Sequence, residues 1–103
     1  MELSVIKEDL KDIRYYYSRK ELFEKASTYS VGKNNILDKI EKYNDVICSA
    51  PPRLYDLYIS LYLQNHTQES LSEKLGYTFE YISRLNTQLV KYLKEQFEKQ
   101  EEN

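Results

Sequence analysis

The sequence predicts an all-α protein of about five helices, in which two longer N-terminal helices precede a C-terminal helix-turn-helix. Lys, Glu, Leu and Gln, which are good helix formers, dominate the 103 residues. Two glycines and two prolines are too few for the turns of a β-sandwich or barrel. Apolar residues recur at steps of three and four along most of the chain, which is the period of an amphipathic helix.

Residues 1–50 predict a pair of helices. The first spans about Ser4 to Ser27, and its apolar stripe comprises Leu3, Ile6, Leu10, Ile13 and Tyr17. Ser18 and Glu21 also fit a capping box, so this helix either is continuous or breaks near Ser18. After a linker over Thr28–Gly32, a second helix spans about Asn34 to Ser49. It is capped by Asn34 or Asn35, and its stripe comprises Ile36, Ile40, Tyr43 and Ile47.

Residues 51–97 predict three more helices of the same single domain, 1–103. Pro51 and Pro52 end the second helix, and Pro52 suits the first turn of a third that runs to about Gln64. That helix directs inward Leu54, Leu57, Tyr58, Leu61 and Tyr62. Thr67 caps a short helix over Gln68–Leu75, and the last helix runs from about Phe79 to Phe97. The polar residues 98–103 are expected to fray.

The stretch from Thr67 to Leu93 predicts the helix-turn-helix, because two helices flank a tight turn that contains glycine. Gly76 occupies the turn, where glycine adopts a left-handed conformation at little cost. Ser72 is the small residue at the expected close approach of the two helices. The apolar residues expected to meet between them are Leu71, Leu75, Ile82, Leu85, Leu89 and Leu93.

The opposite face of the last helix is the predicted DNA-binding surface. The N-terminal half of a recognition helix usually reaches base edges, and Arg84 can bond guanine O6 and N7 together. Gln88 suits adenine, Ser83 and Thr87 suit base or phosphate, and Lys91 and Lys94 suit backbone phosphate. The predicted DNA-binding residues are Thr78, Phe79, Glu80, Ser83, Arg84, Thr87, Gln88, Lys91 and Lys94.

Composition argues against several other classes of protein. The net charge of −2 and the pI of about 5.5 speak against a generally basic nucleic-acid coat, although one face can still dock on DNA. No apolar run approaches the roughly 20 residues of a membrane span, so we expect a cytoplasmic protein with no membrane contact. Eleven tyrosines without tryptophan are interpreted mainly as residues at the edge of the core.

Catalytic, metal and cofactor sites are not expected. His66 and Cys48 are the only histidine and cysteine, too few for a zinc site. We interpret His66 as a loop or surface residue and Cys48 as a small buried one. No Gly-rich phosphate loop or Ser-His-Asp arrangement is present, so the chain is not expected to be an enzyme.

The stretch from Leu54 to Leu93 resembles region four of bacterial sigma factors. Almost the whole chain also resembles a family of small phage and prophage proteins of Gram-positive bacteria, similar to the ArpU-type phage late-gene activators. The segments that carry this resemblance are DLKDIRYYYSRKELF, SAPPRLYDLYISLYL and TQESLSEKLGYTFEYISRLN. The sigma pattern would place Phe79, Glu80, Ser83 and Arg84 in the groove. Sigma factors usually carry arginines where Phe79 and Ser83 stand here.

Two functions follow as hypotheses. In the first, the chain is a phage-type transcriptional regulator in the bacterial host cytoplasm that binds double-stranded DNA. Its N-terminal helices then either complete the core or pair two copies as a homodimer. In the second, it is an adaptor that uses a sigma-like fold to bind RNA polymerase or a phage protein without touching DNA. Phosphate contacts make DNA binding weaken steeply with salt, whereas an apolar adaptor interface is nearly indifferent to it.

Overall fold

The computed structural model describes residues 2–20 and 34–102, and in these ranges the chain is helical with no strand. The helices are α1 (Leu3–Ser18), α3 (Asn34–Ile47), α4 (Pro52–Tyr58), α5 (Gln68–Leu75) and α6 (Phe79–Glu102). A π-helical turn, η1 (Ile59–Leu63), extends α4. The predicted all-α class is therefore confirmed. None of the described helices combines the length and the apolar character that a membrane crossing requires.

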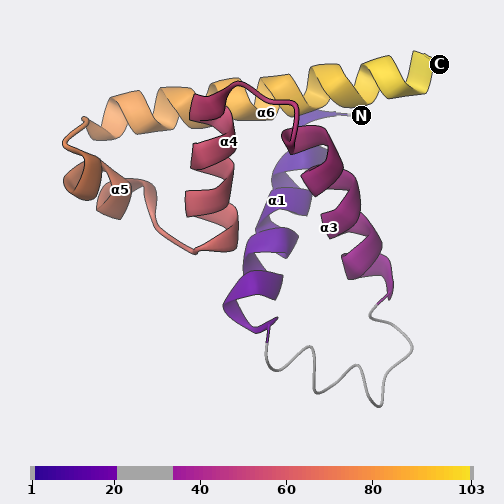
Figure 1. Cartoon of the computed structure of the whole chain (residues 1–103), viewed down its shortest axis with the longest axis horizontal. Coiled ribbons are helices and arrows are strands. Elements are labelled where there is room, and N and C mark those ends of the chain that lie inside the picture. Colours follow the sequence, from indigo (N-terminus) through magenta and orange to yellow (C-terminus); the bar gives the residue numbers. More distant parts are fainter. Residues whose placement is uncertain (1, 21–33, 103) are drawn as a thin grey trace.

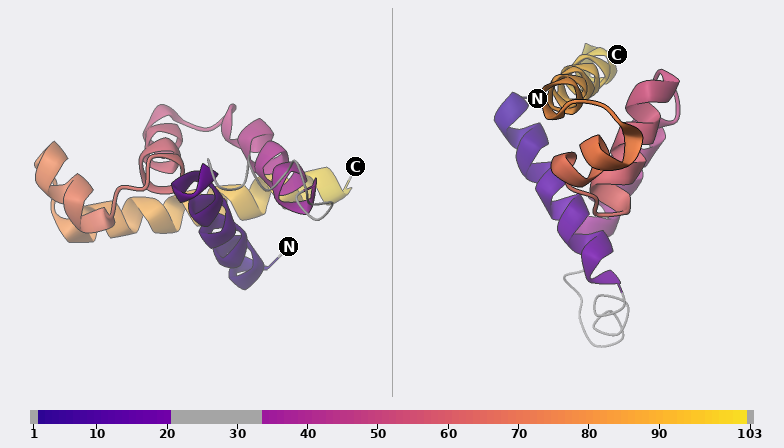
Figure 2. Two further views of the ribbon diagram at one scale, coloured as in Figure 1. Left: turned by 90° about the horizontal axis from the view of Figure 1, so that it is seen from below. Right: turned by 90° about the vertical axis from the view of Figure 1, so that its left-hand side faces the viewer.

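Helix α6 forms one side of the molecule, and α1, α3 and α4 lie against it (Figure 1). Viewed from the start of α6, the helix lies between the ends of α1 and α4 (Figure 2). Helix α5 lies beside the start of α6, to which the turn at residues 76–78 joins it. The N-terminal half of α6 therefore packs on α4 and α5. Its opposite face, called the outer face below, is exposed to solvent among the described residues.

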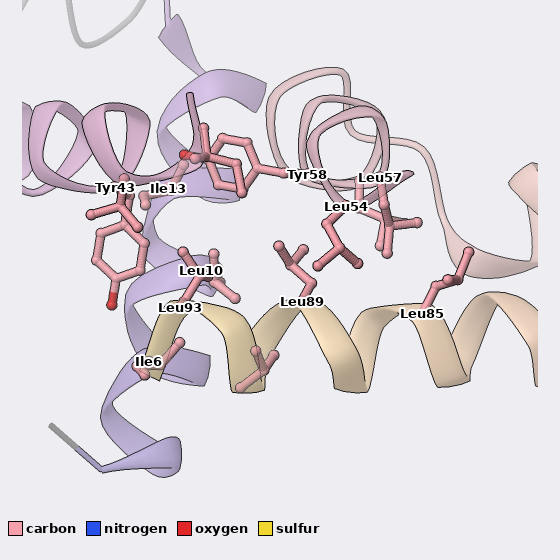
Figure 3. Close-up of a cluster of buried hydrophobic side chains, with 14 of the residues drawn as sticks. Ile6, Leu10, Ile13, Tyr43, Leu54, Leu57, Tyr58, Leu85, Leu89 and Leu93 are labelled. Carbon is pink, nitrogen blue, oxygen red and sulfur yellow. The ribbon is translucent and has the colours of Figure 1, made fainter. Parts of the chain in front are cut away.

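One cluster of buried side chains joins the helices of the described residues. Figure 3 shows Leu89 and Leu93 of α6 facing side chains from α1, α3 and α4. Tyr43 and Tyr58 are fully buried there, and each hydroxyl has a partner. The Tyr43 hydroxyl donates to Asp9 Oδ2 (2.7 Å), and the Tyr58 hydroxyl donates to Asn44 Oδ1 (2.8 Å). These two tyrosines lie deeper than the core-edge position that the composition led us to expect, and their buried hydroxyls are satisfied by hydrogen bonds.

Helix α1 ends at Ser18, because Arg19 leaves the helical conformation with φ −127° and ψ 27°. The prediction of a continuous helix to Ser27 is therefore wrong, and the alternative of a break near Ser18 is confirmed. Within the stripe, Tyr16 is buried more deeply than Tyr17, which packs at the edge of the core, and Leu3 is exposed. At 3.6 residues per turn, positions three and four beyond Ile13 both lie near the stripe. The predicted linker over 28–32 lies outside the described residues.

Helix α3 ends at Ile47, two residues earlier than predicted, and its predicted stripe packs on the core. The side chains of the two predicted caps, Asn34 and Asn35, lie outside the described part. Cys48 lies in the turn after α3 and is exposed, so the prediction that it is buried is wrong. Its position one residue beyond the helix carries it away from the core that Ile47 still reaches.

The third predicted helix has the expected extent, but its last turn is π-helical. The Gln64 backbone N–H donates to the Ile59 carbonyl (2.8 Å), five residues back. Leu61 is buried, and the Tyr62 hydroxyl donates to Asn86 Oδ1 of α6 (2.6 Å). This hydrogen bond joins η1 to α6 at Asn86.

The C-terminal residues do not fray where the sequence suggested, because α6 continues to Glu102. Phe97 is 1% exposed, and its ring meets Tyr43 edge-on at 4.8 Å between centroids. The Lys42 ammonium lies 4.8 Å from the same ring centroid. Once Phe97 fixes the helix, the good helix formers that follow it extend the helix at little cost.

Candidate nucleic-acid interface

The position of α5 is set by its cap and by a contact from α1. The Ser70 backbone N–H donates to Thr67 Oγ1 (2.9 Å), and the Thr67 N–H donates to Ser70 Oγ (3.1 Å). This reciprocal capping box confirms Thr67 as the start of the helix. The Arg14 guanidinium donates to the carbonyls of Asn65 (3.3 Å) and His66 (3.2 Å). Helix α1 therefore holds the loop that leads into α5, and His66 lies in that loop as predicted.

The turn between α5 and α6 depends on Gly76, which has φ 74° and ψ 18°. Its N–H donates to the Ser72 carbonyl (3.0 Å), and Ser72 Oγ donates to the Tyr77 carbonyl. Thr78 then caps α6, because its Oγ1 accepts from the Tyr81 backbone N–H (3.1 Å). Thr78 is one of the predicted DNA-binding residues. Its side chain is exposed and serves as the N-cap of α6.

Replacing Gly76 with valine is expected to lower the free energy of unfolding by about 1–3 kcal/mol, because a β-branched residue is strained at positive φ. No heavy atom lies within 4 Å of an added Cβ, so the cost is backbone strain and not a clash. Gly76→Asn is the matched control, because asparagine adopts this conformation more readily. Urea denaturation followed by far-UV circular dichroism measures both variants. Equal midpoints for Gly76→Val and the parent would contradict the role of this turn.

The two helices meet through Leu71, Ile82 and Leu85, which are all buried as predicted. Leu75 is the exception, since its side chain is 53% exposed. It is the last residue of α5, and the chain turns away at Gly76 before α6 can cover it. The prediction that Leu75 faces inward is therefore wrong.

The outer face of α6 holds most of the predicted DNA-binding residues. Glu80, Arg84, Thr87, Gln88 and Lys91 are exposed. Ser83 is half-buried at the edge of this face, and its carbonyl accepts from Thr87 Oγ1 (3.2 Å). Phe79 lies at the start of the helix and is 50% exposed. Among the described residues, Arg84 has no ion pair, so its guanidinium is available to a ligand.

Lys94 differs from the other predicted cations because it is already paired. Its ammonium donates to Glu98 Oε1, one turn further along α6. This hydrogen bond raises the pKa of Lys94 and lowers the pKa of Glu98, so both stay charged near neutral pH. A contact from Lys94 to phosphate would therefore have to compete with Glu98.

The charge of this region differs from that of the whole chain. Between Thr67 and Lys91, three glutamates are matched by Lys74, Arg84 and Lys91, so the segment is neutral while the chain carries −2. The acidic excess therefore lies elsewhere in the chain.

In the part of the chain that the structure describes, α6 borders a groove and a smaller hollow, neither of which the sequence predicts. A groove of about 300 Å³ lies where α4, α5 and α6 meet, and its apolar lining includes Leu57, Leu71, Leu75, Tyr77 and Tyr81. A smaller hollow of about 150 Å³ lies where the start of α1 passes α6, with Leu3 and Lys7 opposite Ser83, Thr87 and Lys91. No sequence signal places the start of α1 beside this part of α6, because the contact depends on tertiary packing.

In the described ranges, no group of three or more His, Cys, Asp or Glu side chains could hold a metal ion.

Comparison of the chain with protein-family models, curated proteins and solved structures finds no significant match. The geometry and chemistry of the chain itself are therefore what support a function.

Proposed function

We propose that this chain is a phage-type transcriptional regulator that binds double-stranded DNA through α5, the turn at Gly76 and α6. The single observation that supports it most is the open outer face of α6, where polar side chains lie next to a helix pair joined by a three-residue turn. In proteins that bind DNA this way, the second helix of such a pair enters the major groove. The resemblance to sigma region four and to the ArpU-type activators agrees with this proposal.

Specific contacts are assigned to the exposed residues of the first turns of α6. Arg84 is proposed to read guanine, and Gln88 to read adenine one turn later. Thr87 and Lys91 are proposed to contact phosphate, which positions the protein without selecting a sequence.

A homodimer would double the DNA contacts, but it cannot use the buried stripe of α1. Ile6, Leu10 and Ile13 already pack inside the chain. A dimer through the N-terminal helices is therefore proposed to use exposed apolar residues of α1 and α3, of which Val5 and Leu37 are the candidates.

The experiment that tests this proposal is selection from a random DNA library with the purified full chain, at low and at physiological salt. We expect one enriched motif, and a palindromic one would report a dimer. If no motif is enriched at low salt or at physiological salt, the proposal of sequence-specific DNA binding is contradicted.

The second candidate function is the adaptor, favoured by the groove between α4, α5 and α6. Leu75, Tyr77 and Phe79 are each about half exposed around the turn beside it. Such a surface suits an apolar segment of a protein partner, for which RNA polymerase or a phage protein is proposed. If this function holds, purified polymerase binds equally well at about 50 and 200 mM salt, and Leu75→Asp abolishes the binding.

A further inference from the structure

The smaller hollow lies on the side of α6 away from the apolar groove, where the start of α1 passes the recognition helix. Lys7 approaches it from α1, and Lys91 approaches it from α6. Ser83, Asn86 and Thr87 of α6 line the same hollow. The two lysines thus come from segments about eighty residues apart in the sequence, and the fold brings both to the lining of one hollow.

The polar groups that line this hollow are suited to an anion. The Asn86 side-chain oxygen already accepts from the Tyr62 hydroxyl, which leaves the amide nitrogen of Asn86 as the group that can donate. Ser83 Oγ has no partner in the described part of the chain, so its hydroxyl can also donate. No carboxylate belongs to the lining that the structure describes.

The two lysines also differ from their neighbours in having no ion pair. Lys11, one turn after Lys7 on α1, pairs with Glu8 at 3.5 Å. Lys39 pairs with Asp9 and Asp12, and Lys94 pairs with Glu98. Among the described residues, Lys7 and Lys91 have no such carboxylate partner. Two unpaired cations beside hydroxyl and amide donors are the groups that bind a phosphate.

We propose that this hollow receives a phosphate group of the DNA backbone, held between Lys7 and Lys91. The proposal rests on the DNA-binding function and extends the interface from α6 to the first helix. It explains how an acidic protein can present positive charge to DNA. The start of α1 supplies a cation beside the recognition helix that the sequence of the helix-turn-helix does not contain.

The test compares the salt dependence of DNA binding for the parent, Lys7→Ala and Lys91→Ala, using a duplex that carries the enriched motif or, failing one, a random duplex. Each phosphate contact contributes about 0.9 to the slope of log K against log salt. Each variant is therefore expected to bind more weakly at low salt and to have a slope shallower by about one. Between about 50 and 200 mM salt, its affinity should fall about threefold less than that of the parent.

Lys11→Ala is the matched control, because it removes the same charge from the same helix one turn away. Its slope should equal that of the parent. If the parent binds DNA and Lys7→Ala keeps the parent slope, the phosphate site is refuted while the DNA-binding function stands. If the parent binds no duplex at low salt, both proposals fail. Inorganic phosphate is the second probe, followed by amide NMR shifts at Ser83 and Asn86. If phosphate shifts these amide signals but neither Lys7→Ala nor Lys91→Ala changes duplex binding, the hollow is a site for small anions. The proposed contact with the DNA backbone is then refuted.

Discussion

Phe97→Ala is expected to lower the free energy of unfolding by about 3–5 kcal/mol, the usual cost of removing a buried phenylalanine ring. Phe97 is 1% exposed and stands where the last turns of α6 meet α3. The substitution removes the edge-on contact with Tyr43 and the contact between the Lys42 ammonium and the ring. It also leaves a cavity where the ring was. Urea denaturation followed by far-UV circular dichroism measures the change.

Lys99→Ala is the control for this prediction, because Lys99 lies two residues later on the same helix and is exposed. It should change the free energy of unfolding by less than about 0.5 kcal/mol. An equally small effect of Phe97→Ala would mean that the end of α6 does not pack on α3. The C-terminal residues would then fray, as their polar sequence suggested.

The sequence predicts the local features of this fold well, because those features depend on neighbouring residues. Thr67 as a cap, Gly76 in a left-handed turn and Pro52 in the first turn of α4 each follow from short-range chemistry. The buried positions of α6 follow from its period, since Ile82, Leu85, Leu89 and Leu93 share one face.

The features that were missed depend on what one helix meets on another. Leu75 has the right spacing for the core, yet no other helix covers it. The sequence alone predicts Phe97 at the end of the last helix, since the Tyr43 ring that anchors Phe97 lies more than fifty residues earlier in the chain. The place of Lys7 beside Lys91 likewise requires knowing how α1 crosses α6. Periodicity identifies the face of a helix but not its neighbour.

The buried tyrosines also show that the sequence predicts local features but not the contacts between helices. Composition indicated residues at the core edge, but not that Asp9 and Asn44 would accept from Tyr43 and Tyr58. Burial raises the pKa of both hydroxyls. Because each phenol holds its proton more tightly in the folded state, stability is retained below about pH 10 and lost as the pH rises above it.

Arg84→Ala is expected to weaken binding to the selected DNA by about 1–3 kcal/mol, or roughly 5- to 150-fold, and to relax preference at one base position. Arg84 is exposed on the outer face of α6 and has no ion pair among the described residues. Its substitution should therefore leave stability nearly unchanged. Repeating the DNA selection with the variant measures the change in preference directly.

Arg84→Lys separates a base contact from a phosphate contact, because lysine keeps the charge but loses the planar pair of donors. A contact to guanine predicts that the lysine variant loses base preference while the salt slope stays close to that of the parent. A contact to phosphate predicts the reverse, with preference kept in both variants and the slope reduced only in Arg84→Ala. Arg53→Ala supplies the control, since Arg53 lies at the rim of the apolar groove. If Arg53→Ala and Arg84→Ala weaken DNA binding equally, without changing preference, Arg84 contributes only charge and the assignment of base reading to Arg84 is refuted.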